Sequence, residues 1–220
     1  MISPEINKCV KNDVDLNKDN KNMLIMGPTG SGKTRYLEYI LKCLKYSNIG
    51  IVPAENMEYT PFKYIFNNIF FKKINKASKN ENENGILLDF EKYFNEEGFK
   101  LLLMDEIYSS TTPEQAFISA KNKLTKFMKK EDTTFIATSH FKEHINLCKE
   151  SENRIKNYFV LVNEENEGNF VLKFKILPEN KNNKDKNWWF REEEEFYKKR
   201  LRYAIWKEKI EKEKLLSSKS

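Results

Sequence analysis

The feature that most restricts the fold of this chain is a glycine-rich turn, residues 27–34, that directly follows a short apolar run. The run, Met-Leu-Ile-Met at 23–26, has the length and composition of a buried strand. After the turn, apolar residues recur at helical spacing, namely Tyr36, Leu37, Ile40, Leu41 and Leu44. A strand, a glycine-rich loop and a helix in this order predict the first unit of an α/β fold with a parallel sheet.

The turn reads Gly-Pro-Thr-Gly-Ser-Gly-Lys-Thr and satisfies the pattern G-x-x-x-x-G-K-[ST] in full. Glycines let backbone N–H groups approach phosphate oxygens closely, and the helix N-terminus adds partial positive charge. A chance match is disfavoured by the flanking strand and helix. We therefore expect a nucleotide to bind at Gly27, Pro28, Thr29, Gly30, Ser31, Gly32, Lys33 and Thr34. Lys33 should reach the β and γ phosphates, and the Thr34 hydroxyl should hold Mg²⁺.

Further strands and helices alternate along the chain, which predicts a mainly parallel sheet flanked by helices. Residues 60–74 fit either a strand or a helix. The other expected elements are strands at 49–52, 101–104 and 133–139, helices at 86–96, from Pro113 to about 130 and through Cys148, and a β-hairpin over 155–178.

The end of the chain changes character. A polar linker at 181–186 precedes a charge-rich segment from Trp188 onward, whose apolar residues are spaced for one stripe of a helix. We expect 1–178 to form the α/β domain and 179–220 to form a linker and a charged helix. That helix is expected either to mediate dimers or to fold back on the domain.

Composition excludes several classes of protein. The formal net charge of +6 is compatible with nucleic-acid binding and equally with simple solubility. The three cysteines form no C-x-x-C pair, so neither a zinc site nor a disulfide framework is predicted. No signal peptide or apolar run of membrane-spanning length is found, which predicts a soluble intracellular protein with no membrane contact. Cys43 is expected in the core.

Two carboxylates, Asp105 and Glu106, follow the apolar run at 101–104. At the carboxyl end of a buried strand, Asp105 is placed to hold Mg²⁺. An adjacent acid can orient and polarise an attacking water, so Glu106 is the expected catalytic carboxylate of a hydrolytic site. The alternative is that both acids cap the next segment.

A histidine, His140, ends the expected strand at 133–139. An imidazole there can hydrogen-bond a γ-phosphate or the attacking water. A lone histidine is more often a satisfied polar residue, but the order of loop, Asp-Glu pair and histidine on neighbouring strands favours catalysis by Lys33, Glu106 and His140. His144 is expected at the surface.

These segments together resemble the MutS family of DNA mismatch-repair ATPases, in their ABC-type P-loop ATPase domain. The resemblance is carried by residues 7–16, 22–43, 49–55, 101–115, 135–144 and 155–178. It implies a P-loop NTPase that binds ATP and Mg²⁺, hydrolyses ATP, and dimerises with a second copy or a partner ATPase subunit. It also implies DNA as a partner.

The chain departs from the family pattern at three places. Thr29, Gly30 and Ser31 stand in the middle of the loop, where the family has Asn-Met-Gly. No Ser-Thr-Phe signature, which completes the partner's ATP site, is found near 80–90. The mismatch-reading, lever and clamp domains are not found, so we expect a stand-alone ATPase or one subunit of a larger assembly.

Two alternatives to a MutS-like ATPase stay open at this level. The chain can be a nucleotide-binding interaction module with little hydrolysis, which the absent Ser-Thr-Phe motivates. A transporter's nucleotide-binding subunit is disfavoured, because no LSGGQ-like signature precedes residue 101. The lysine-rich stretch at 121–130 fits DNA phosphate contacts and a solvated helix face equally well.

Overall fold

The computed structural model describes residues 10–51, 54–69, 92–109, 111–165 and 169–179, with the backbone alone for 162–165 and 169–173. The expected linker and charged helix after residue 179 lie outside these ranges. Within them the chain forms one six-stranded sheet in the order β2-β3-β4-β1-β5-β6. All neighbouring strands are parallel except β5 and β6, which form an antiparallel hairpin. The α/β class and the mainly parallel sheet are thereby confirmed.

Most of the strands and helices follow each other as the apolar runs predict. The strands are β1 (Asn22–Met26), β2 (Tyr64–Asn67), β3 (Lys100–Met104), β4 (Thr133–Ser139), β5 (Ile155–Glu165) and β6 (Asn169–Pro178). The helices are α1 (Lys33–Ser47), α4 (Pro113–Met128), the 3₁₀ turn η2 (Lys142–Ile145) and α5 (Asn146–Glu150). Pro113 occupies the first turn of α4, where its missing N–H costs nothing.

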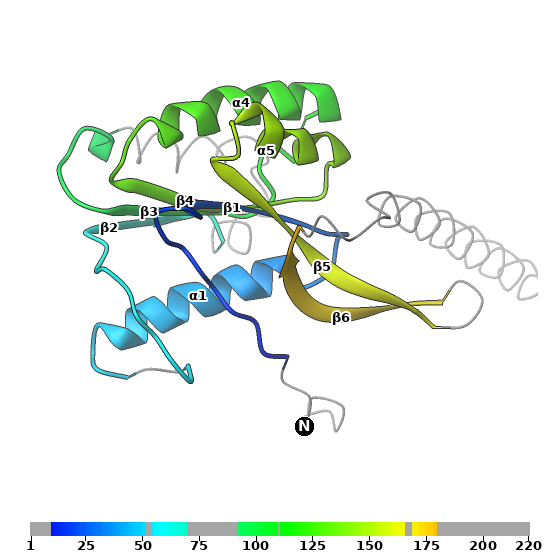
Figure 1. Ribbon diagram of the computed structural model, residues 1–220, viewed down its shortest axis with the longest axis horizontal. Helices are drawn as coiled ribbons and strands as arrows, with labels where there is room; N and C mark the ends of the chain where they lie inside the picture. Colours follow the sequence, from blue (N-terminus) through cyan, green and yellow to red (C-terminus); the bar gives the residue numbers. More distant parts are fainter. Residues whose placement is uncertain (1–9, 52–53, 70–91, 110, 166–168, 180–220) are drawn as a thin grey trace, which may run out of the picture.

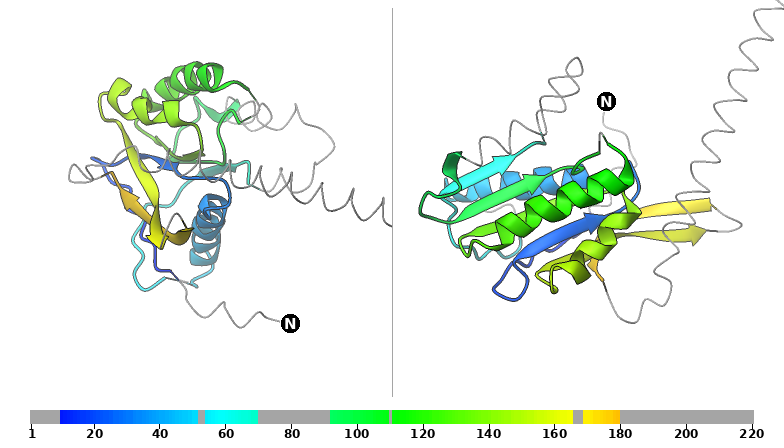
Figure 2. Two further views of the ribbon diagram at one scale, coloured as in Figure 1. Left: turned by 90° about the vertical axis from the view of Figure 1, so that its right-hand side faces the viewer. Right: turned by 90° about the horizontal axis from the view of Figure 1, so that it is seen from above.

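Helices cover the sheet on both faces (Figure 1). α1 lies on one face, and α4 and α5 lie on the other, as the two further views also show (Figure 2). Alternate residues of β3 point to opposite faces: Leu101 and Leu103 join the cluster under α1, whereas Leu102 and Met104 join the cluster under α4. The central strands are buried on both faces, which explains their continuous apolar sequence.

Two expectations about elements were wrong or only partly met. No strand forms at 49–51: a turn follows α1, and Ile49 and Ile51 are 69% and 56% exposed. These two isoleucines pair with no strand of the described residues. The undecided stretch 60–74 contains the short strand β2, and residues 70–74 are not described. Of the helix expected at 86–96, only residues 92–93 are described as helical, and turns follow.

The hairpin carries an irregularity that bends β6 beside the glycine-rich loop. Val160 pairs with Ile176, but Val162 pairs with Leu172, so β6 contains extra residues at this point. Phe174 lies in that bulge with a left-handed backbone (φ 54°). Asn12 fills the gap in the ladder: its side chain donates to the Phe174 carbonyl (2.9 Å) and accepts from the Ile176 N–H (2.7 Å).

Candidate functional site

Three adjacent strands end at the same edge of the sheet, and each end carries a residue singled out in the sequence. β1 runs into Gly27, β3 into Asp105 and β4 into His140. Because β3, β4 and β1 are parallel neighbours, their carboxyl ends meet. The expected order of these segments on three neighbouring strands is therefore confirmed.

The glycine-rich loop closes on itself through Lys33. The ammonium Nζ donates to the carbonyl oxygens of Gly27 (2.6 Å) and Pro28 (2.8 Å), and the residue is only 4% exposed. Gly30 and Gly32 have left-handed φ angles of 85° and 91°. Thr29 and Gly30 are exposed at the tip of the loop, and Pro28 is half-buried.

The loop also has polar groups with few hydrogen bonds to the rest of the described residues. Gly32 is the N-cap of α1 and provides no side-chain cap. The Ser31 hydroxyl is buried, and no hydrogen-bond partner for it exists within the described ranges. A helix N-terminus without a side-chain cap favours an anion, since its first N–H groups lack intrahelical partners.

The carboxylate of Asp105 lies directly beside this loop. Thr34 donates its hydroxyl to Oδ2 (2.9 Å), and Thr138 from β4 donates to Oδ1 (2.8 Å). Asp105 is 3% exposed, so both oxygens are held in fixed positions. The two residues expected to bind metal, Thr34 and Asp105, are thus brought into contact across 71 positions of sequence.

Glu106 begins a loop with an unusual backbone. Glu106 and Tyr108 both have left-handed φ angles, 50° and 54°, which cost energy for residues other than glycine. The residue between them, Ile107, is buried, and its N–H donates to the Thr138 carbonyl (3.0 Å). This tether fixes the loop that presents Glu106 at the sheet edge.

The two histidines have different environments. His140 is half-buried directly after β4, with its ring 4.4 Å from that of Phe141. His144 was expected at the surface, and this is wrong: it is fully buried, between the rings of Phe117 and Phe141. Burial lowers the pKa of His144 to about 4. The short η2 turn places it under α4, which a single-residue reading of the sequence could not detect.

Three residues near the site were missed by the sequence reasoning. Thr138 and Asn68 hydrogen-bond Asp105, and the Phe174 ring lies over Gly32, where an added Cβ would come within 3.0 Å of Cδ1. Thr138 lies inside the strand predicted at 133–139, where its β-branched side chain suits a strand and gives no local signal of a role in the site. Residues 80–90, where the Ser-Thr-Phe signature of the MutS family would fall, lie outside the described ranges.

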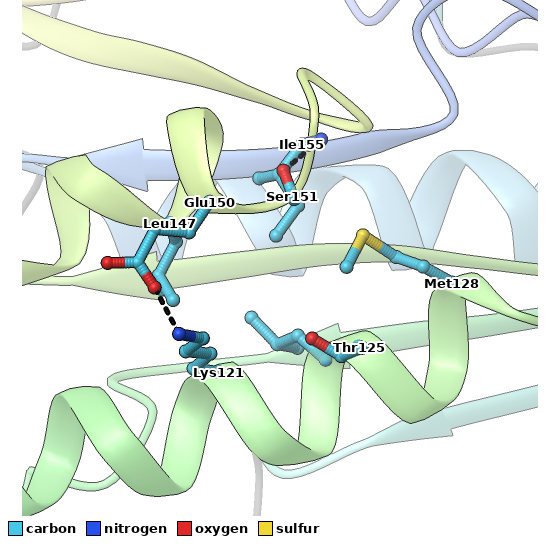
Figure 3. Close-up of a pocket in the computed structure, with 8 residues that line it drawn as sticks. Lys121, Thr125, Met128, Leu147, Glu150, Ser151 and Ile155 are labelled. Atoms are coloured by element: carbon cyan, nitrogen blue, oxygen red, sulfur yellow. Dashed lines mark hydrogen bonds and ion pairs between the residues drawn. The ribbon is translucent and has the colours of Figure 1, made fainter.

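A small pocket exists elsewhere, between α4 and α5 (Figure 3). Lys121 and Glu150 form an ion pair across its mouth (2.6 Å), above Leu124, Leu147 and Ile155. Ile155 begins β5 and pairs with Asn22 at the start of β1, so the pocket lies at the edge opposite the glycine-rich loop. It therefore takes no part in the site.

Comparison with known proteins points to one group. No protein-family model matches the chain. The chain is 30% identical over 147 residues to Endonuclease MutS2 of Lactobacillus helveticus. The aligned region covers 65% of this chain and 18% of that protein. The chain is also 30% identical over 154 residues to Endonuclease MutS2 of Caldicellulosiruptor bescii, or 68% of this chain and 19% of that protein. The chain thus spans about a fifth of the length of the relatives it matches. These matches support in part the resemblance to MutS proteins.

Among the helices of the described ranges, none combines the length and the apolar character required to cross a bilayer.

Proposed function

We propose that this chain is a P-loop NTPase of the ABC type that binds ATP with Mg²⁺ and hydrolyses it. The observation that carries the proposal is the 2.9 Å contact between the Thr34 hydroxyl and Asp105. It joins the end of the glycine-rich loop to the strand-end carboxylate, as Mg²⁺ coordination between a loop threonine and a strand-end aspartate requires.

The side-chain oxygens at this contact are suitable ligands for the Mg²⁺ of a bound nucleotide. Carboxylate and hydroxyl oxygens are hard ligands, and Mg²⁺ commonly takes one or two protein ligands together with phosphate oxygens and waters. Lys33 at present donates to two loop carbonyls, and these bonds can be exchanged for phosphate oxygens. The buried Ser31 hydroxyl and the uncapped start of α1 supply further donors.

Hydrolysis would depend mainly on positioning and charge stabilisation. Glu106 would orient and polarise the attacking water, because it follows Asp105 at the same sheet edge. His140, at the end of the adjacent strand, would hydrogen-bond the γ-phosphate or that water. The rigid loop anchored at Ile107 keeps Glu106 in place during this step.

Binding is tested by calorimetric titration of ATP and Mg²⁺ into the full chain and its Lys33→Ala variant. We expect the affinity for ATP to fall about 10- to 100-fold, since hydrogen bonds to charged groups are lost. Lys42→Ala is the matched control, because Lys42 is exposed on the same helix. Equal affinity of all three proteins would contradict phosphate binding at the loop.

A second candidate function is a nucleotide-binding interaction module that barely hydrolyses ATP. It is favoured by the sequence at 80–90, which contains no Ser-Thr-Phe signature. Without that signature, one copy of the chain would not complete the ATP site of its partner. Tight ATP binding with negligible turnover, alone and with any partner ATPase subunit, would favour the module over the hydrolase.

A role in DNA handling is proposed from the name of the relatives, Endonuclease MutS2. The second half of α4 and its C-cap fit phosphate contacts, with Lys121, Lys126 and Lys129 exposed, although Lys121 also pairs with Glu150. Phosphate contacts predict that duplex DNA binding weakens steeply between 50 and 200 mM salt, by roughly tenfold or more for a few contacts. Binding that does not change with salt would argue against this surface.

A further inference from the structure

We infer that Thr138 and Asn68 are positioning residues that hold Asp105 and Glu106 in the geometry needed for Mg²⁺ and the attacking water. The inference depends on the proposed ATPase function and extends it to two residues outside the glycine-rich loop and the acidic pair. Each of the two side chains forms two hydrogen bonds to this pair of acidic residues, Thr138 from the end of β4 and Asn68 from the residue after β2.

Thr138 links the two acids through a single hydroxyl. Its Oγ1 donates to Asp105 Oδ1 (2.8 Å) and accepts from the Glu106 N–H (2.8 Å). A hydroxyl can do both at once because it has one donor and two acceptor positions. Thr138 is fully buried at the end of β4, and its carbonyl accepts from Ile107. One residue therefore sets the carboxylate orientation and the path of the loop that carries Glu106.

Asn68 holds the main chain of Asp105 from the other side. β2 ends at Asn67, and the N–H of the next residue, Asn68, donates to the Leu103 carbonyl (3.3 Å). Its side-chain amide then accepts from the Asp105 N–H (2.6 Å) and donates to the Asp105 carbonyl (3.0 Å). The amide acts as an extra peptide group that extends the ladder one step beyond the strand, to the functional residue itself.

Packing alone does not explain these two side chains. Asn68 is 8% exposed and Thr138 fully buried, and valine would fill the space of Thr138 without polar atoms. The hydroxyl is needed because Glu106 is in a left-handed conformation and its N–H has turned from the sheet ladder toward Thr138. Removing the hydroxyl leaves that N–H and Oδ1 without this partner, and both can move.

The test compares four variants of the full chain: Thr138→Val, Thr138→Ser, Asn68→Asp and Thr133→Val. Thr133 is the matched control, because it is a buried threonine at the opposite end of β4 whose hydroxyl bonds Asp132 (3.2 Å). The measurements are ATP affinity in EDTA, the Mg²⁺ concentration for half-maximal ATP turnover, and turnover at saturating Mg²⁺ and ATP.

For Thr138→Val we expect the Mg²⁺ requirement to rise and turnover to fall, each by about 10- to 100-fold, as for other groups that orient metal ligands. ATP affinity in EDTA should change less than about twofold, since the loop holds the phosphates. Thr138→Ser should restore most of the activity. Asn68→Asp should raise the Mg²⁺ requirement too, because it loses the donor to the Asp105 carbonyl and adds a like charge beside Asp105.

Three results would overturn the inference. If Thr138→Val and Asn68→Asp match Thr133→Val in Mg²⁺ requirement and turnover, the residues are merely structural while the ATPase proposal stands. If the affinity for ATP in EDTA falls by as large a factor as the Mg²⁺ requirement rises, the variants distort the fold generally, and the inference is also wrong. If the wild-type chain shows no Mg²⁺-dependent ATP binding, the proposed function fails, and the inference fails with it.

Discussion

At the scale of single residues, His144 is the side chain whose burial has the clearest measurable effect. An unfolded histidine titrates near 6.5, and in the fold its pKa is about 4. Between these values the unfolded chain binds more protons than the folded chain, so stability is full above about pH 6.5 and declines as the pH falls toward 4.

We predict that the free energy of unfolding falls by about 2 kcal/mol from His144 alone between pH 7 and pH 5. Denaturant titrations of the wild type and of His144→Phe at both pH values measure the difference. The variant keeps an aromatic ring beside Phe117 and Phe141 but has no titrating nitrogen. An identical pH dependence of the two proteins would contradict the buried neutral imidazole.

Two glycines of the loop differ in what surrounds them. Both Gly30 and Gly32 have left-handed φ angles, so alanine at either should cost roughly 1–2 kcal/mol of stability. Only at Gly32 would the new Cβ meet a neighbour, the Phe174 ring at 3.0 Å, whereas nothing lies within 4 Å of Gly30.

Gly32→Ala should therefore be less stable than Gly30→Ala by about 1 kcal/mol, in thermal or denaturant unfolding without nucleotide. Combining Gly32→Ala with Phe174→Ala should recover this difference as a coupling free energy in a double-mutant cycle. Additive effects would show that β6 does not lie against the loop.

At the scale of elements, an internal ion pair joins the starts of β3 and β4. Lys100 is fully buried and donates to Asp132 Oδ2 (2.6 Å) and to the Gly98 carbonyl (3.0 Å). Burial would raise the pKa of Asp132, but the hydrogen bond and charge of Lys100 lower it below its ordinary value. This pair fixes the strand register at the edge opposite the site.

Lys100→Met should destabilise the protein by about 2 kcal/mol, because the partly exposed acceptors at Gly98 and Asp132 lose a charged donor. Lys121→Met is the matched control, since its pair with Glu150 is exposed and should contribute less than about 1 kcal/mol. Free energies of unfolding from denaturant titration measure both. Equal costs would show that burial of the Lys100 pair adds nothing.

Most of the elements were predictable because their sequence patterns are unambiguous. The runs at 23–26 and 101–104 are apolar throughout, the run at 133–139 combines apolar residues with threonines, and the fold buries all three on both faces. Residues 49–52 have a similar apolar pattern, but a strand needs a neighbour to pair with, and the described part of this stretch has none. Periodicity does not report the presence of a partner, which explains this error.

The site was predictable only where a motif fixes chemistry to spacing. Lys33 and Thr34 follow from the loop pattern, and Asp105 from its place after an apolar strand. Thr138 and Asn68 act through hydrogen bonds across strands that lie far apart in sequence. No local pattern encodes such contacts, so only the tertiary structure identifies them.

At the scale of the whole molecule, the site lies at the carboxyl ends of parallel strands in a sheet that helices cover on both faces (Figure 1). We propose, from the resemblance to MutS proteins, that a second copy covers a nucleotide bound there. We predict that Glu106→Gln, which should retain ATP, doubles its mass with Mg²⁺ and ATP in light scattering and not with EDTA. A mass that stays the same in both conditions would contradict dimerisation across ATP.

Steady-state phosphate release measures whether these residues form an ATP-hydrolysing site. We predict Mg²⁺-dependent turnover by the wild-type chain and a loss of about 100-fold or more in Glu106→Gln, the range expected when a positioned acid–base group is removed. Glu114→Gln, a change of an exposed acid in the first turn of α4, should keep the wild-type rate. Turnover in Glu106→Gln equal to that of the wild type would contradict the account.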